Sequence, residues 1–186
     1  MFSKTIAPLI AATSLASCAT SSAPTISVPR ATEVIANAAV VTSRSKMRQY
    51  ANLFKSACLD QSPGFANTDD LLTKSGFRRV SGSDASTGNR GSAYTDGTAY
   101  ASLVVSSRSN NVCSVAVKTN DDDPLVADLK RVVAASQFAS GRFSAGGLFG
   151  ASFVVQRGSK PGHIIAVGRQ QRSAQSPTSF SLIDFR

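Results

Sequence analysis

His163 is the only histidine in the 186-residue chain, so it is the one side chain whose ordinary pKa suits general acid or base catalysis near neutral pH. The carboxylates available to orient it are Asp96 and the run Asp121-Asp122-Asp123. No serine, cysteine or aspartate is joined to His163 by a recognisable catalytic motif, and histidines in surface turns are common. We therefore assign no catalytic residue. A small hydrolase or ligand-binding protein that uses His163 is the alternative hypothesis.

The consecutive carboxylates Asp121 to Asp123 offer oxygen atoms that a divalent cation prefers. Consecutive side chains point in different directions, however, and the run lacks the alternating spacing of a calcium loop. Pro124 follows directly, which favours a helix with Asp123 as its N-cap and the carboxylates beside the positive end of the helix dipole. We expect neither a metal site nor a cofactor.

The segment from Gly141 to Gly150 is glycine-rich, as phosphate-binding loops are. No Lys-Ser or Lys-Thr pair follows it, and it lies between a predicted helix and a predicted strand, the reverse of the order in a dinucleotide-binding fingerprint. Around Ser152 the second glycine of a nucleophile elbow is missing. The sequence favours a glycine-rich chain reversal.

Lysine and arginine outnumber aspartate and glutamate by 20 to 11, which gives a formal charge of +9. The excess is dispersed, as in a solvated surface, and the alternative is a face that binds an anionic partner. Nucleic acid is not an expected partner, because few aromatic residues lie among the basic ones. The candidate contacts to an anionic partner are Arg44, Lys46, Arg78, Arg79, Lys130 and Arg131.

Hydrophobic periodicity predicts the elements that carry these residues. Helices are expected in the segment 33–59, at 67–76 and after Asp123; strands are expected at 77–80, 99–106, 112–119, 149–155, 163–169 and 180–185. Residues 81–93 have the composition of a mobile loop, and no internal repeat is visible. A content of 42% hydrophobic and 17% charged residues is typical of a globular chain. We expect an α+β fold: a single domain with about three helices packed on a mostly antiparallel sheet.

The first residues have the layout of an export signal, with Lys4 before an apolar stretch that is too short to span a bilayer. The stretch ends in Leu15-Ala16-Ser17-Cys18, and here the chain resembles bacterial lipoproteins, whose lipobox ends in an invariant cysteine. The resemblance implies cleavage after Ser17, lipid on Cys18, and anchoring in the cell envelope on the periplasmic side, with the outer membrane favoured. The alternative is a secretory signal cut near Ser21, which releases a soluble protein.

This reading divides the chain into an export signal at 1–17, a lipidated flexible linker at 18–32 and a globular domain at 33–186. The domain then has about 150 residues, enough to bury a core.

Cys58 and Cys113 are the two cysteines that remain once Cys18 is lipidated or removed. In an oxidising compartment such a pair favours a disulfide. Cys58 continues the apolar helical spacing that includes Phe54, and Cys113 alternates with Val115 on the apolar face of a strand, so both sulfurs are expected to face the core. CxxC-like spacing, which a metal or redox pair would favour, is missing.

Two classes of function follow. We expect a non-enzymatic accessory or interaction subunit of the cell envelope, anchored by lipid, whose partner is an envelope protein or an anionic polymer. The hydrolase or ligand-binding protein using His163 stays as the alternative.

Overall fold

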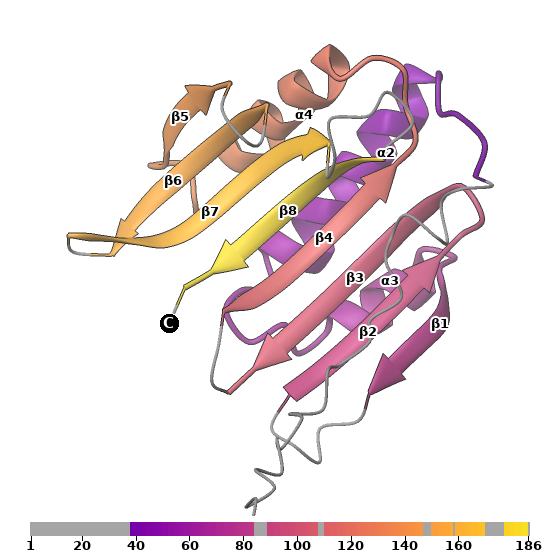
Figure 1. The fold of residues 1–186 in the computed structure, drawn as a ribbon, viewed down its shortest axis with the longest axis horizontal. Coiled ribbons are helices and arrows are strands. Elements are labelled where there is room, and N and C mark those ends of the chain that lie inside the picture. Colours follow the sequence, from indigo (N-terminus) through magenta and orange to yellow (C-terminus); the bar gives the residue numbers. More distant parts are fainter. Residues whose placement is uncertain are drawn as a thin grey trace, which may run out of the picture.

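A computed structural model describes residues 38–83, 89–107, 110–146, 150–157, 159–169 and 177–185. These residues form one eight-stranded antiparallel sheet with the helices on one face (Figure 1), which confirms the predicted α+β class. The helices are α2 (Arg44–Phe54), which continues into the π-helical turn η1 (Lys55–Leu59), α3 (Thr68–Lys74) and α4 (Asp123–Ala134). The strands are β1 (Arg78–Ser83), β2 (Asn89–Thr95), β3 (Ala99–Ser106), β4 (Asn111–Val117), β5 (Arg142–Ala145), β6 (Ala151–Arg157), β7 (Lys160–Arg169) and β8 (Thr178–Asp184).

The sheet consists of two four-stranded meanders that meet at their last strands. Its order is β1-β2-β3-β4-β8-β7-β6-β5, and β4 pairs antiparallel with β8. Helix α2 precedes the first meander and α4 precedes the second, so the architecture repeats although the sequence shows no repeat. The two halves share the alternation of side chains along their strands. This pattern does not fix which residue stands at each position, so the two sequences need not resemble each other.

Two predicted irregular segments are partly strand. Residues 81–93, expected to be a mobile loop, contribute the end of β1 and most of β2, and residues 84–88 lie outside the described part. The glycine-rich segment 141–150 contains β5, which pairs with β6. In both segments the residues are small, so hydropathy does not alternate along the strand. Backbone hydrogen bonds to a neighbouring strand stabilise the extended conformation, and composition does not indicate them.

The core lies between the helices and the apolar face of the sheet. Cross-strand register aligns one row of buried side chains across six strands: Leu103, Cys113, Leu182, Ile165, Phe153 and the partly buried Phe143. Phe54 of α2 stacks on Phe180 of β8, with ring centroids 5.6 Å apart. Each fully buried side chain of this size stabilises the fold by about 1.5–3 kcal/mol, so the rows hold the helices on the sheet.

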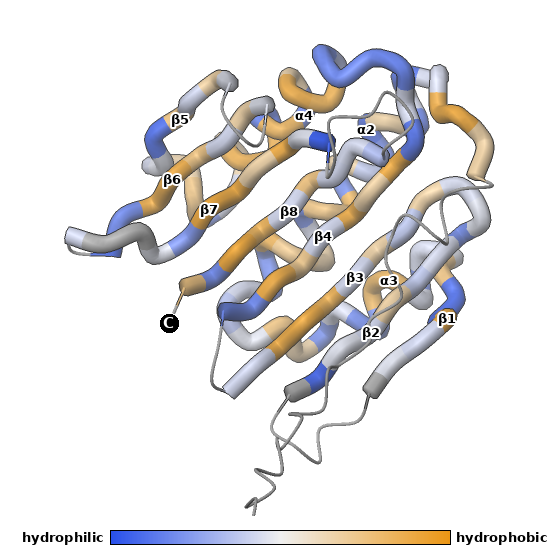
Figure 2. The backbone as a smooth tube through the Cα atoms, viewed as in Figure 1, coloured by the Kyte–Doolittle hydropathy of each residue, from blue (hydrophilic) through white to orange (hydrophobic). Residues whose placement is uncertain are grey.

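The opposite face of the sheet carries no charge over six strands, which we call the uncharged face. Its middle row consists of serine and alanine alone, and the row beside it is aliphatic except for Gly91. The Ser102 and Ser114 hydroxyl oxygens lie 2.7 Å apart. In Figure 2 the hydrophilic residues gather at strand ends and in the helical layer. The rows are Gly91, Val104, Val112, Ile183, Ile164 and Val154; Ala93, Ser102, Ser114, Ser181, Ala166 and Ser152; and Thr95, Tyr100, Ala116, Ser179 and Gly168.

Candidate functional site

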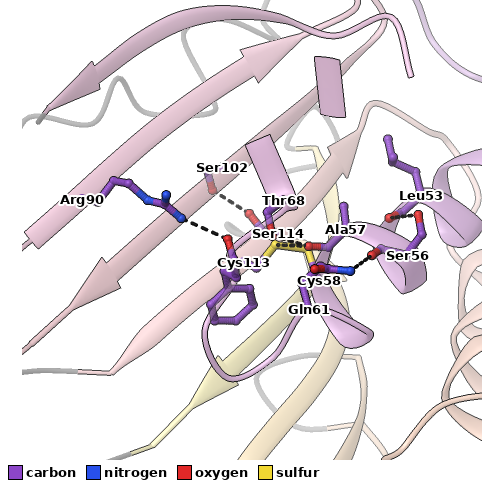
Figure 3. Close-up of a disulfide and its surroundings, with 11 residues drawn as sticks. Leu53, Ser56, Ala57, Cys58, Gln61, Thr68, Arg90, Ser102, Cys113 and Ser114 are labelled. Carbon is purple, nitrogen blue, oxygen red and sulfur yellow. Dashed lines mark hydrogen bonds between the residues drawn. A yellow bond between two sulfur atoms is a disulfide. The ribbon is translucent and has the colours of Figure 1, made fainter. Parts of the chain in front are cut away.

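Cys58 of η1 and Cys113 of β4 form the predicted disulfide, with their Cα atoms 5.6 Å apart (Figure 3). Both residues are buried, so the bond fixes the helical layer to the middle of the sheet. The same helical turn is held from a second side, because the Thr68 hydroxyl donates to the carbonyl oxygen of Ala57 at 2.6 Å. Cys18, the predicted lipidation site, lies outside the described residues.

His163 lies on the helix-facing side of β7 and contacts Asp184, its cross-strand neighbour on β8. The His163 Nε2 atom is 3.1 Å from Asp184 Oδ1. Asn111, the next residue in this row, donates to Asp184 Oδ2 at 3.4 Å and accepts from the backbone N–H of Ser106 at 2.9 Å. Burial lowers the pKa of His163, and the nearby Asp184 carboxylate opposes that shift.

The predicted carboxylate partners of His163 are therefore wrong. Asp96 accepts the Tyr50 hydroxyl at 2.8 Å and the backbone N–H of Ala99 at 2.6 Å, so it caps the turn between β2 and β3. Asp184, the actual partner, could not be found from spacing, because it is 21 positions from His163 in the sequence and only strand register brings the two together.

The run Asp121 to Asp123 also has a structural role, but the N-cap of the helix is not the predicted Asp123. Helix α4 begins at Asp123, and the N-cap is Asp122. The Asp122 carboxylate makes no capping bond; it accepts from Arg169 Nε at 2.8 Å and from the Thr178 hydroxyl at 2.5 Å. It thus fastens the start of α4 to the ends of β7 and β8. Among the described residues no cluster of histidine, cysteine and carboxylate groups is arranged to hold a metal ion.

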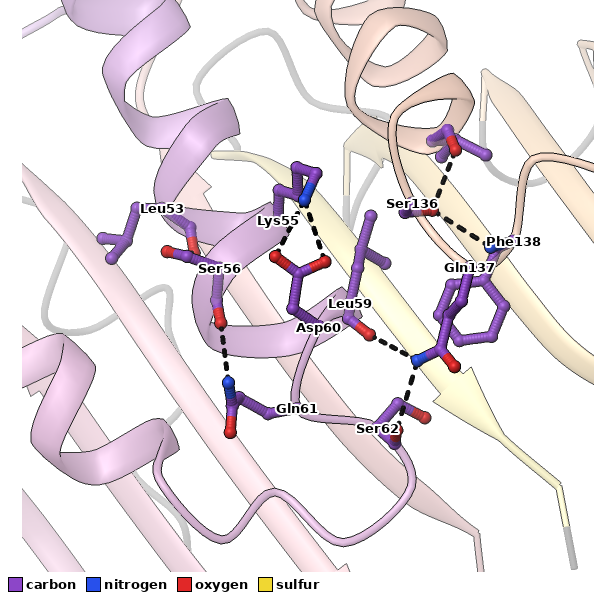
Figure 4. Close-up of polar contacts among 11 residues, drawn as sticks. Leu53, Lys55, Ser56, Leu59, Asp60, Gln61, Ser62, Ser136, Gln137 and Phe138 are labelled. Carbon is purple, nitrogen blue, oxygen red and sulfur yellow. Dashed lines mark hydrogen bonds and ion pairs between the residues drawn. The ribbon is translucent and has the colours of Figure 1, made fainter.

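The loop that closes the core beside His163 is fixed by backbone contacts (Figure 4). The Gln137 side chain donates to the carbonyl oxygens of Leu59 at 2.9 Å and Ser62 at 3.2 Å. The ring of Phe138 lies 4.8 Å from the ring of His163. Within the described ranges no hydrogen bond joins His163 to a serine or threonine hydroxyl, and the buried Ser62 hydroxyl has no hydrogen-bond partner. In the part of the chain that the structure describes, the contacts of His163 are with Asp184 and Phe138.

The basic residues predicted to contact an anion occupy different parts of the fold. Arg78 and Arg79 lie on the edge strand β1, whereas the Lys130 ammonium group sits 4.1 Å from the ring centroid of Phe143 on the opposite edge strand. Lys46 is exposed on α2. The two remaining predicted residues, Arg44 and Arg131, lie close together.

Arg44 and Arg131 meet at Asp128, together with Arg48, which the prediction missed. Guanidinium nitrogens of Arg44, Arg48 and Arg131 lie 3.6, 3.8 and 3.4 Å from the Asp128 carboxylate. Arg131 also donates to Asn52 Oδ1 at 2.9 Å, which joins α4 to α2. We call Arg44, Arg48 and Arg131 the arginine cluster. The four-residue spacing of Arg44 and Arg48, and an aspartate on an apolar helix face, were the available signals.

A small cavity adjoins the arginine cluster at the start of α2. It measures about 160 Å³, and its lining includes Val41, Arg44, Met47 and Pro124 together with the acidic Asp121. Pockets for drug-sized ligands usually measure about 300–1,000 Å³, so this cavity does not accommodate such a molecule.

No helix among the described residues is long and apolar enough to cross a membrane. No family model matches the chain, and no curated protein or solved structure is significantly similar to it.

Proposed function

We propose that the protein is an exported, lipid-anchored accessory protein of the cell envelope that acts by binding another envelope protein rather than by catalysis. Two features support export: the lipobox-like Leu15-Ala16-Ser17-Cys18 and the Cys58–Cys113 disulfide, a bond that is stable in oxidising compartments.

The uncharged face is the observation that carries the binding role. A chain with a formal charge of +9 keeps six neighbouring strands free of charge on the side away from the helices. Side chains such as Val112, Ile164 and Ile183 are partly exposed there. Part of the face is covered, because Ala93, Tyr100 and Ala116 are at most 1% exposed and Ala38 packs against them. The accessible part is the aliphatic row of Val104, Val112, Ile183, Ile164 and Val154. This accessible aliphatic row favours a partner with an uncharged, apolar surface.

The alternative hydrolase or ligand-binding function receives less support. The His163 side chain is 15% exposed, its ring lies tilted against that of Phe138, and its carboxylate neighbour Asp184 is buried in the same row. These contacts are typical of a polar pair with a structural role at the end of the hydrophobic core. We expect His163→Ala to leave the cellular role intact when the variant is folded; loss of that role in a folded variant would move the enzyme hypothesis to the front.

Anchoring is tested through Cys18. Because acylation requires the cysteine thiol, Cys18→Ala should shift the protein from the membrane fraction to the soluble fraction and remove the mass of the lipid. Unchanged fractionation and unchanged mass would contradict the lipoprotein proposal.

Binding is tested by placing charge on the uncharged face. The variant Ile164→Lys/Ser181→Lys puts two ammonium groups where the partner must pack, and desolvating them is costly. The matched control, Gln49→Lys/Ala134→Lys, adds the same charge at exposed positions of the helical layer. In a crosslinked envelope pull-down, one partner protein should be lost with the first variant and retained with the control. Retention with both variants would refute the interface, and recovery of a second copy alone would replace the envelope partner by self-association.

A further inference from the structure

The start of α2 carries charges that oppose its own dipole. Arg44, Lys46 and Arg48 lie in its first five residues, and its first turn contains no acidic residue. A helix N-terminus bears partial positive charge, so cations there destabilise the helix and anions stabilise it. The helix therefore gains nothing from this placement by itself, whereas an anionic ligand would be attracted to both the dipole and the side chains.

The arginine cluster keeps most of its hydrogen-bonding capacity. Asp128 is 1% exposed, whereas the side chains of Arg44, Arg48 and Arg131 are 46%, 58% and 42% exposed. Their distances of 3.4 to 3.8 Å to the carboxylate exceed the 2.7–2.9 Å of strong charge-assisted hydrogen bonds, and Asp128 Oδ2 has no hydrogen bond. Three cations against one anion leave two net positive charges.

The chain reaches this cluster from the uncharged face, where Ala38, the first described residue, packs against Ala93, Tyr100 and Ala116. The backbone N–H of Val41 donates to the carbonyl oxygen of Lys118 at 2.7 Å, and Ser43, the N-cap of α2, immediately precedes Arg44. Cys18 precedes Ala38 by 20 positions. A chain of that length spans at most about 70 Å, so a lipid on Cys18 keeps the cluster close to the bilayer that holds it. Tethering raises the effective concentration of a weak second contact.

We propose that the arginine cluster binds the phosphate groups of anionic phospholipids and holds the α2–α4 layer against the membrane. Guanidinium groups match phosphate oxygens in pairs. The three exposed side chains come from the neighbouring helices α2 and α4 (Figure 1), and such a spread suits a flat, laterally extended anionic surface. The inference rests on the proposed function, because anchoring is what brings this layer to a bilayer.

The test uses residues 18–186 with Cys18→Ser, the chain that the implied cleavage leaves, so that neither the apolar export signal nor an acyl chain contributes to binding. Co-sedimentation is measured with vesicles of phosphatidylcholine alone and with vesicles of equal parts phosphatidylcholine and phosphatidylglycerol. We expect binding to the second kind only, weakening as salt rises. Asp128→Asn removes the anion among the arginines and should strengthen binding about fivefold, since one charge near the membrane surface contributes about that factor.

A second variant removes the cluster. It combines Asp128→Asn with the three substitutions Arg44→Gln, Arg48→Gln and Arg131→Gln, because a buried carboxylate without its partners would destabilise the fold. The net loss of two charges should weaken binding about thirtyfold. The matched control, Arg78→Gln/Arg142→Gln, removes two exposed charges from the edge strands and should change binding less than about twofold. Circular dichroism verifies that each variant is folded, and Asp128→Asn tests the proposal independently of the combined variant.

Three results would overturn the inference. Equal weakening in the cluster variant and its control would show that total charge alone drives binding. Soluble glycerol phosphate binding as tightly as the vesicles would identify a small-anion site in place of a membrane contact. No binding to the phosphatidylglycerol vesicles would exclude the membrane contact and leave the anchoring proposal standing, because Cys18→Ala fractionation tests anchoring separately.

Discussion

Removing the Cys58–Cys113 disulfide tests how the helical layer is held on the sheet. The bond joins residues 55 positions apart. Closing a loop of this length restricts the unfolded chain and stabilises the folded protein by about 4 kcal/mol in the chain-entropy account. Domains of ordinary size have a free energy of unfolding of about 5–15 kcal/mol, so losing the bond removes a large share of it.

The assay is urea denaturation of Cys58→Ala, Cys113→Ala and the double variant against the parent protein. Each single variant already breaks the crosslink, so the double variant should cost little more than either one. The denaturant m-value should rise, because the unfolded chain without the crosslink exposes more surface. The parent protein should have an intact mass lower by two hydrogens than its reduced form. A loss below about 1 kcal/mol with an unchanged m-value would refute the reasoning, as would free thiols at both positions in the native protein.

Two further predictions concern Asp122 and His163. Asp122→Ala should destabilise the protein by about 2 kcal/mol, because the buried Thr178 hydroxyl and the Nε atom of Arg169 both donate to this carboxylate. Asp123→Ala, at an exposed position, should stay within about 0.5 kcal/mol in the same urea assay. Burial lowers the pKa of His163, so the unfolded chain binds a proton more readily; stability should be full above about pH 6.5 and fall as the pH drops below it, and His163→Asn should reduce this slope in denaturation series at several pH values.

Local patterns predicted the parts of the fold in which large side chains alternate with polar ones. Strand β3 was predicted with its observed limits, 99–106, and Leu103 faces the core while Ser102 lies on the opposite face. The disulfide followed from the same reasoning, since helical spacing and strand alternation each pointed one cysteine toward the core. The prediction of a loop around Gly91 and Ala93 was wrong, because small residues carry almost no hydropathy signal that would indicate strand β2.

Contacts between distant parts of the chain could not be predicted from spacing. Register alone brings His163 to Asp184, and the sheet order, in which β4 adjoins β8, has no signature in either strand. Asp128 is a partial exception: its place on an apolar helix face indicates that it needs a partner, but only the packing of α2 on α4 shows that the partners include Arg44 and Arg48. Long-range pairing depends on the energy of the whole sheet, which no single segment encodes.

The two proposed surfaces lie on opposite sides of the sheet, and this geometry links the proposals. The arginine cluster belongs to the helical layer, and the uncharged face covers the other side of the same strands. A domain held by its helical layer against a bilayer therefore directs the uncharged face away from the lipid, where a partner protein can reach it. The strands between the two surfaces are fixed by rows of buried side chains and by the disulfide, so engaging one surface need not deform the other. Binding energies at such separated sites add independently, which distinguishes this arrangement from one in which lipid and partner compete for a single surface.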